Sequence, residues 1–140
     1  MAFQSFLKPK KTYYLKRIGK DNDGGYLVGS NSIKDAKNIV SLGISDDWSF
    51  EKNFLKHNNN IKIFCYDDQI SIKFLIKKIL NNLFIFFFNL KLKKLLSSII
   101  NLFDFIQISR KIKFTKKKIN YDDLNNITEN LDKIFIKIDI

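Results

Sequence analysis

The chain has 140 residues, enough for a single domain with its own hydrophobic core. Its formal net charge of +11 is typical of nucleic-acid-binding proteins. However, Lys, Ile, Asn, Phe and Leu dominate the composition, a bias that requires no basic binding surface, and we expect no nucleic-acid partner. One cysteine and one histidine exclude a disulfide framework, a thiol or histidine metal site, and catalysis by a histidine-based triad.

Residues 1–37 are predicted to form a basic leader followed by a turn and short elements. Residues 1–20 carry six basic and no acidic side chains, and Pro9 argues against one continuous helix there. No signal-peptide pattern is recognised, so we expect a cytoplasmic protein. A turn over 21–25, a strand over 26–28 and a helical turn over 32–37 complete this part.

The rest of the chain alternates strands with helices, which predicts an α/β fold with parallel strands and right-handed crossovers. We divide it into 38–68 with the first two strands, 69–110 as a helical insert, and 111–140 with strands three and four. The predicted strands are 38–44, 61–66, 112–114 and 133–140. The predicted helices are 49–57 and 70–108, the second an apolar segment interrupted by the lysine pairs 77–78 and 93–94. Residues 121–130 are predicted to form a helix or a loop, with Asn120 or the region of Thr128 and Glu129 as a possible cap.

The last strand contains an almost continuous apolar run, Ile134, Phe135, Ile136, Ile138 and Ile140, typical of a strand buried on both faces. The chain ends within this run. We therefore expect it to be the amino-terminal part of a larger enzyme. A strand order of 3-2-1-4 would leave the outer edge of the fourth strand unpaired. We expect the isolated chain to be marginally stable, aggregation-prone or oligomeric.

The insert is unusually apolar, and three interpretations stay open. Its longest charge-free stretch, 79–90, has twelve residues, against about 20 for a helix that spans a bilayer. The helices could pack on the domain as core, or form a lid that binds the acceptor. Alternatively, residues 71–108 could make a peripheral membrane contact, with their lysines toward anionic headgroups.

Acidic residues follow three of the predicted strands, and these strand ends define the candidate site. Gly43 ends the first strand and lets a ligand approach the backbone closely, although an ordinary strand-to-helix turn capped by Asp47 or Ser49 explains the pattern equally well. Asp67 follows the second strand, 24 residues after Gly43, a spacing that suits an acid that binds ribose hydroxyls. Asp139 lies at the end of the last strand. No phosphate-binding glycine loop is present in the sequence.

Four segments resemble, in this order, the FkbM-type S-adenosylmethionine-dependent methyltransferases: RIGKDNDGGYLV (17–28), VSLGISDDWSFE (40–51), IFCYD (63–67) and FIKIDI (135–140). The resemblance implies an incomplete class I methyltransferase sheet, which is Rossmann-like, with the long apolar insert between strands two and three. It also implies O-methylation of a hydroxyl on a sugar, a glycan or a similar small molecule, with S-adenosylmethionine as the cofactor.

The resemblance assigns roles to single residues of this chain. It places Asp139 beside the methyl-transfer site as a candidate base and has Asp67 bind the adenosine ribose. The remaining cofactor-binding candidates match either the leading motif, the loop after the first strand, or the acid of the first helix: Asp23, Gly24, Gly25, Tyr26, Gly43, Ser45, Asp47 and Glu51.

Two departures from the family pattern leave an alternative open. Ser41 replaces the acid that usually precedes the first loop glycine, and Ser45 and Asp47 stand where further glycines would be. The Glu-Gly turn that follows the last motif in the family is absent from this sequence. The alternative is a truncated, catalytically silent remnant or a membrane-associated binding module.

Overall fold

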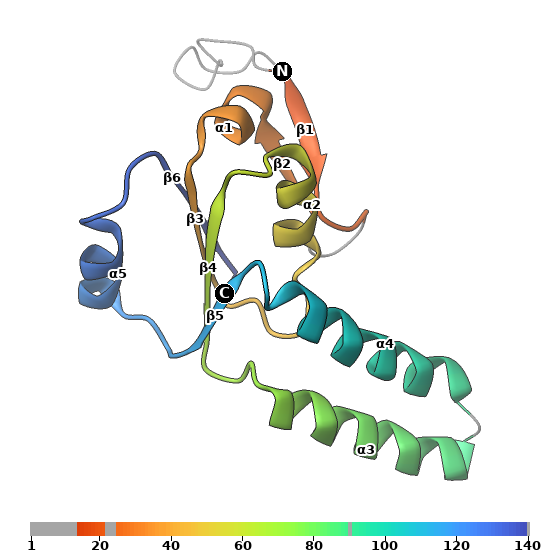
Figure 1. Cartoon of the computed structure of the whole chain (residues 1–140). Coiled ribbons are helices and arrows are strands. Elements are labelled where there is room, and N and C mark those ends of the chain that lie inside the picture. Colours follow the sequence, from red (N-terminus) through yellow and green to blue (C-terminus); the bar gives the residue numbers. More distant parts are fainter. Residues whose placement is uncertain (1–13, 22–24, 90, 140) are drawn as a thin grey trace, which may run out of the picture.

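A computed structural model of the chain describes residues 14–21, 25–89 and 91–139. The basic leader before residue 14 therefore lies outside the described residues, as do Asp23 and Gly24 of the leading motif. The described part is an α/β fold in which helices flank a parallel four-stranded sheet (Figure 1). This arrangement is compatible with a Rossmann-like fold.

The sheet has the strand order β5-β4-β3-β6, and every neighbouring pair is parallel. When these four strands are numbered one to four along the chain, the order is 3-2-1-4, so the predicted strand order is confirmed. The strands are β3 (Asn38–Leu42), β4 (Lys62–Asp67), β5 (Lys113–Lys116) and β6 (Ile134–Ile138). Because the chain crosses from β5 on one side of β3 to β6 on the other, the order reverses between β3 and β6.

A second, two-stranded sheet precedes the parallel sheet. Strand β1 (Leu15–Ile18) pairs antiparallel with β2 (Tyr26–Gly29), and α1 (Ser30–Asp35) follows. The strand after the glycine turn is confirmed, but the assignment of residues 15–18 to a leader is wrong. In β1 only Ile18 is buried, at 0% exposure, so the segment carries almost none of the alternation by which a strand is recognised.

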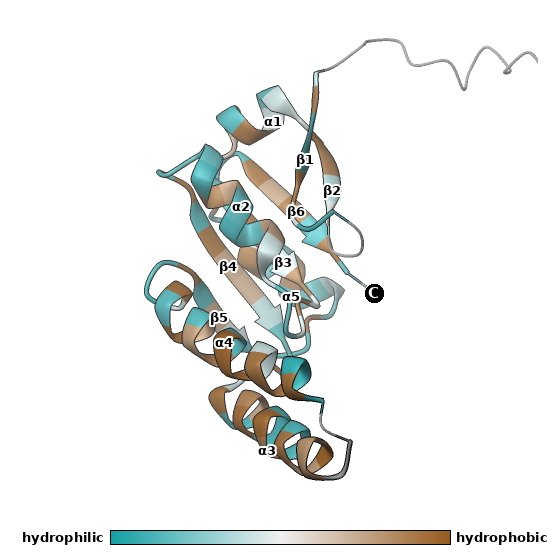
Figure 2. Cartoon of the chain, turned by 90° about the vertical axis from the view of Figure 1, so that its right-hand side faces the viewer, coloured by the Kyte–Doolittle hydropathy of each residue, from teal (hydrophilic) through white to brown (hydrophobic). Residues whose placement is uncertain are grey.

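Helix α2 (Ser49–His57) supplies the main packing on one face of the sheet. The rings of Phe50 and Phe54 lie 5.9 and 5.5 Å from the ring of Phe135 on β6. Phe50 and Phe54 are buried because they lie one turn apart on the same side of the helix. Figure 2 shows α2 lying over the central strands, close to α1 and the two-stranded sheet.

The prediction that β6 is buried on both faces is wrong. Ile136 and Ile138 are 42% and 53% exposed, whereas Lys137 between them is buried. The face with Lys137 is covered by α2. On the other side of the sheet lies α5 (Tyr121–Thr128), which has no buried residue and so covers little of the strand (Figure 1). Residues 121–128 form a helix, and Asn120, one of the two predicted caps, is its N-cap: Asn120 Oδ1 accepts the Asp123 N–H at 2.8 Å.

Helices α3 (Ile72–Asn89) and α4 (Leu92–Ile108) form a hairpin between β4 and β5 that projects away from the sheet (Figure 1). The lysine pairs 77–78 and 93–94, which interrupt the apolar segment in the sequence, both lie inside helices, and the chain turns near residue 91 instead. Lysine is a good helix former, so a pair of them does not end a helix. Phe105 and Ile108 join the core, but much of the hairpin does not.

Candidate functional site

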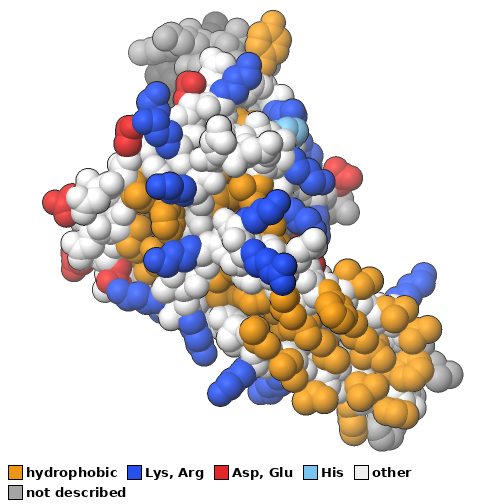
Figure 3. Space-filling view, in the orientation of Figure 1, with side chains coloured by type: hydrophobic (Ala, Val, Ile, Leu, Met, Phe, Trp, Pro, Cys, Tyr) orange, Lys and Arg blue, Asp and Glu red, His pale blue; other side chains and the backbone are white. Residues whose placement is uncertain are grey.

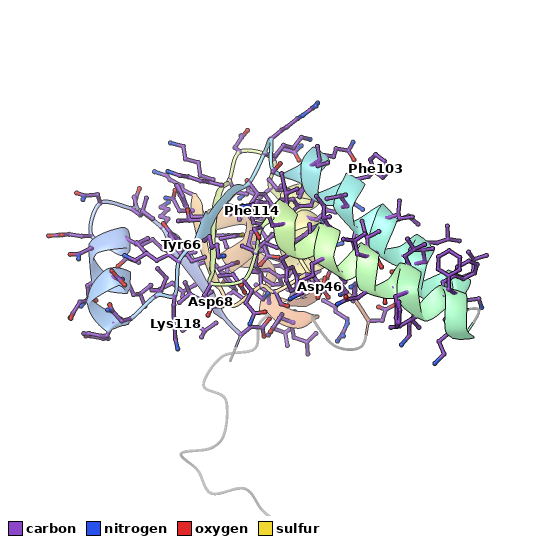
Figure 4. All side chains as sticks on the ribbon, turned by 90° about the horizontal axis from the view of Figure 1, so that it is seen from below. Asp46, Tyr66, Asp68, Phe103, Phe114 and Lys118 are labelled. Carbon is purple, nitrogen blue, oxygen red and sulfur yellow. The ribbon has the colours of Figure 1, made fainter. Side chains whose placement is uncertain are left out.

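The carboxyl ends of β3, β4 and β6 bring the predicted strand-end residues together. The Asp139 N–H donates to the Leu42 carbonyl at 3.0 Å, and the Gly43 N–H donates to the Tyr66 carbonyl at 3.0 Å. Gly43 and Asp139 therefore meet at the point where the strand order reverses. Figure 4 looks onto this edge, with Asp46 and Asp68 in the loops after β3 and β4.

Gly43 is required by the packing of the neighbouring strand. Its φ is +71°, in the left-handed region that favours glycine. A Cβ at this position would collide with the carbonyl oxygen of Asp139. The space beside Gly43 is thus filled by β6. Gly25 is similarly constrained, since a Cβ there would collide with the Lys20 carbonyl oxygen.

Asp67 ties the loop after β3 to the start of the hairpin. Its Oδ1 accepts the backbone N–H groups of Gln69 at 2.7 Å and Ile70 at 3.0 Å, and its Oδ2 accepts that of Ser45 at 2.8 Å. Ser45 has a φ of +47°, so this bond holds a backbone conformation that serine rarely adopts. A carboxylate can accept about four hydrogen bonds, so these three bonds leave one acceptor position on Oδ2 unused in a residue that is 9% exposed.

Asp47 is engaged by a lysine and by the start of α2. Its carboxylate lies 2.9 Å from Lys20 Nζ, and its Oδ1 accepts the Ser49 N–H at 2.9 Å. Burial alone would raise the pKa of Asp47, but the bonds from Lys20 and Ser49 outweigh burial and lower it. The N-cap residue is Trp48, which makes no side-chain cap bond, so the prediction that Asp47 or Ser49 is the N-cap is wrong. Asp47 lies one residue before the N-cap, and Ser49 is the first residue of the helix.

A buried ionic network connects four elements behind this edge. Ser41 on β3 donates to Glu51 Oε1 at 2.7 Å, and Lys137 Nζ lies 3.3 Å from the same oxygen. Lys137 also reaches Asp139 Oδ2 at 3.2 Å, and the Tyr26 hydroxyl donates to Asp139 Oδ1. Tyr26, Glu51 and Asp139, three of the sequence candidates, are thus joined through Lys137, which sequence reasoning did not select.

The burial of this network decides which members can meet a ligand. Glu51 is 0% exposed and its Oε2 has no partner, so it holds Lys137 and cannot contact a ligand. Burial would lower the pKa of Lys137, but the charges of Glu51 and Asp139 and the bond to Asp139 raise it. The Asp139 side chain is 41% exposed, so this carboxylate of the network is accessible to a ligand from solvent.

The remaining nucleophile and base candidates are not placed for catalysis. Cys65 is a core residue, and burial raises the pKa of its thiol well above 9.0. His57 is the last residue of α2 and is exposed. Slight burial and the neighbouring Lys16 and Lys56 lower the pKa of His57.

A polar groove of about 990 Å³ adjoins the loop after β3 and extends along the hairpin. Its lining combines acids of the loops with lysines and amides of the helices, among them Asp46, Asp47, Lys78, Asn82, Lys93 and Asn101. A second groove, of about 690 Å³, lies between α2 and α4, and none of the predicted site residues lines it. The polar groove is therefore the one that continues the candidate site.

Within the described ranges, no group of three or more His, Cys, Asp or Glu side chains is placed to hold a metal ion. In that part of the chain, no helix combines the length and hydropathy that crossing a bilayer requires. Comparison with protein-family models, with curated proteins and with solved structures gave no match to this chain. The FkbM resemblance therefore stays a prediction.

Proposed function

We propose that the carboxyl edge of the parallel sheet binds S-adenosylmethionine and that the protein methylates a hydroxyl of a sugar, a glycan or a similar small molecule. The observation that carries this proposal is the reversal of strand order between β3 and β6. Open α/β sheets bind ligands outside the carboxyl ends of their strands at such a switch point. Gly43 and Asp139 meet there, and Asp67 follows the next strand.

The residues at this edge fit the charge and the polar groups of the cofactor. Bound S-adenosylmethionine supplies an electrophilic methyl group on a cationic sulfonium. The unused position on Asp67 Oδ2 suits one donor, as a ribose hydroxyl would be. The carboxylates of Asp47, Asp67 and Asp139 offset a positive charge. Gly43 contributes only the shape of the turn, since its open side faces β6.

Asp139 is the residue that we assign to the acceptor. Tyr26 holds one of its oxygens and Lys137 the other, so the orientation of the carboxylate is fixed while its side chain stays partly exposed. In the proposed reaction it accepts the proton of the acceptor hydroxyl, and most of the rate enhancement comes from positioning. The neighbouring groove offers amides, hydroxyls and ammonium groups that suit a polyhydroxylated acceptor.

A second candidate function is a binding module without catalytic activity. It is favoured by the number of protein donors that the three edge carboxylates already accept. Asp67 takes three backbone N–H groups, Asp47 takes Lys20 and Ser49, and Asp139 takes Tyr26 and Lys137. Such a site can bind a ligand, but its carboxylates have too few unoccupied acceptor positions to take the proton of a hydroxyl.

Calorimetric titration of the full chain with S-adenosylmethionine and S-adenosylhomocysteine tests the proposal. We expect saturable binding that Asp67→Asn weakens about tenfold, because a hydrogen bond to a charged group is worth about 1.5 kcal/mol or more. Asp68→Asn, a change at the next residue, which is exposed, should leave binding unchanged. Circular dichroism must show that both variants are folded.

The absence of binding by the folded wild-type chain would overturn the proposal. Binding without formation of S-adenosylhomocysteine from S-adenosylmethionine, across a panel of sugar and glycan acceptors, would favour the binding module instead.

A further inference from the structure

The helical hairpin exposes an apolar stripe on each of its two helices. On α3 the exposed fractions run from 37% at Leu83 to 74% at Phe87, and on α4 they run from 41% at Ile106 to 68% at Phe103. Members recur every three or four residues, so each set lies along one side of its helix. The stripes consist of Ile72, Ile76, Leu80, Leu83, Phe84 and Phe87 on α3, and Leu92, Leu96, Ile100, Phe103 and Ile106 on α4.

The buried residues of the hairpin lie on other sides of the two helices. Leu75 joins the core of the domain, Leu95 is 9% exposed, and Asn82 donates to the buried Ser98 hydroxyl of the other helix at 2.5 Å. The exposed stripes are therefore additional to the contacts that form the hairpin. Figure 3 shows hydrophobic side chains gathered on one face of the hairpin, with Lys and Arg side chains at its margins. We call these eleven stripe residues the hairpin face.

An exposed apolar patch of this extent marks a surface that binds a partner or a membrane. The predicted interpretation of the insert as core helices holds only for its base, where Phe105 and Ile108 join the core. Because the hairpin face is exposed, a partner outside the described residues is needed to cover it.

The charge of the hairpin identifies the chemistry of that partner. The two helices and the turn between them carry six lysines and one acid, Asp104. Asp104 already accepts the Trp48 indole N–H at 2.8 Å and the Lys52 ammonium. Lys78 pairs with Asp46, and within the described residues no ion pair engages the other five lysines. The partner surface must accept apolar side chains and be anionic.

A second copy of this chain fits that requirement poorly. In a symmetric dimer the same patch meets itself, so the lysines of both hairpins would gather at one interface. Like charges placed together across an interface oppose binding. An anionic membrane surface, in contrast, offers an apolar acyl region bordered by negative headgroups, which suits a face of Leu, Ile and Phe with lysines at its margins.

We propose that the hairpin face docks on the surface of a membrane that contains anionic phospholipid, with both helices lying in the plane of the interface. The lysines at the margins contact the headgroups, and the apolar stripes enter the boundary between headgroups and acyl chains. The proposal rests on the hairpin alone and does not depend on the function proposed for the sheet edge.

Co-sedimentation of the full chain with vesicles tests this docking. The probes are vesicles of phosphatidylcholine alone and of phosphatidylcholine mixed with phosphatidylglycerol. We expect strong partitioning onto the mixed vesicles that falls about fivefold for each lysine removed in Lys73→Gln/Lys77→Gln. Phe87→Gln/Phe103→Gln should lower it by about tenfold or more, because two exposed apolar anchors are lost.

Matched controls separate the hairpin from general charge and hydrophobicity. Lys62→Gln/Lys113→Gln makes the same change in net charge at exposed lysines outside the hairpin. Leu27→Gln/Tyr121→Gln removes two apolar groups that are 66% and 77% exposed elsewhere. Both controls should keep partitioning within about twofold of the wild-type value, the range expected for changes away from the contact. Equal losses in the control and hairpin variants would overturn the proposal.

Two further results would also overturn it. One is equal sedimentation with both vesicle types. The other is a concentration-dependent dimer in analytical ultracentrifugation that Phe87→Gln/Phe103→Gln dissociates, combined with no binding to vesicles, because a second copy would then occupy the hairpin face.

Discussion

The phenylalanine side chains of helix α2 are buried, whereas two of those in the α3–α4 hairpin are exposed. In α2, Phe50 and Phe54 are 1% and 0% exposed and pack on Phe135 of the sheet. In the hairpin, Phe87 and Phe103 are 74% and 68% exposed. The more apolar of the two regions is thus the one that is less buried.

The difference lies in how the apolar residues are distributed around each helix. Helix α2 is a short amphipathic helix whose apolar side faces the sheet, while Lys52 and Lys56 stay on its outer side. Each hairpin helix is apolar on more than one side, so the partner helix covers only part of it. High hydrophobicity therefore predicts that a segment forms a helix, but it does not say what covers that helix.

The largest effect should come from a core change that has a matched change on the hairpin. We expect Phe54→Ala to lower the free energy of unfolding by about 3–5 kcal/mol, because it empties a fully buried site. Phe103→Ala removes an equal volume from the hairpin face and should change the free energy of unfolding by less than about 0.5 kcal/mol. Urea unfolding measures both. Similar losses in the two variants would show that the hairpin face is covered in solution.

The buried network behind the sheet edge should give the next effect. Lys137→Met leaves Glu51 charged, buried and bonded only to Ser41, and we expect a loss of about 3 kcal/mol. Adding Glu51→Gln removes the uncompensated charge and should restore part of that stability. A lone Lys137→Met that is as stable as the wild type would contradict the ion pair.

The same network predicts a dependence on alkaline pH. The pKa of Lys137 is raised above its usual value of 10.5, so folding favours the ammonium form. Its contribution to stability is complete below that value and is lost as the pH rises through the higher pKa of the folded state. Urea midpoints measured above neutrality should fall in this alkaline range for the wild type, and this fall should be smaller in Lys137→Met. An equal fall of the urea midpoint in both proteins would show that titrating groups other than Lys137 cause it.

A smaller effect is expected at the turn after β3. Gly43→Ala places a Cβ against the Asp139 carbonyl at a φ of +71°, and we expect a loss of about 2 kcal/mol. Gly29→Ala is the control, since a Cβ there would meet only Ser32 Oγ, at 3.4 Å. Thermal melts compare the two variants. If the Gly43→Ala variant were as stable as the control, β6 would not approach the turn.

The sequence predicted the parts of the fold that depend on local pattern. Alternating apolar strands and amphipathic helices indicated the parallel sheet, while its strand order came from the family resemblance, and the acids after the strands indicated the edge where Asp67 and Asp139 lie. These inferences succeed because parallel strands share one carboxyl edge, whatever the details of packing.

The parts that it did not predict depend on contacts between distant residues. Lys137 and Glu51 are 86 positions apart, and only the sheet and α2 together place them in contact. The one available signal was a lysine inside an apolar strand, which implies a buried partner without naming it. The hairpin turn was missed because neither Gly nor Pro marks residues 89–92.

Hydrogen–deuterium exchange on the full chain tests the separation of the two regions most directly. We predict that S-adenosylhomocysteine slows exchange in residues 43–47 and 67–70 and leaves the hairpin unchanged. Vesicles with phosphatidylglycerol should slow exchange in residues 72–87 and 92–106 and leave the sheet edge unchanged. The same pattern of protection with both ligands, or no protection with either, would contradict the assignment of two distinct binding regions.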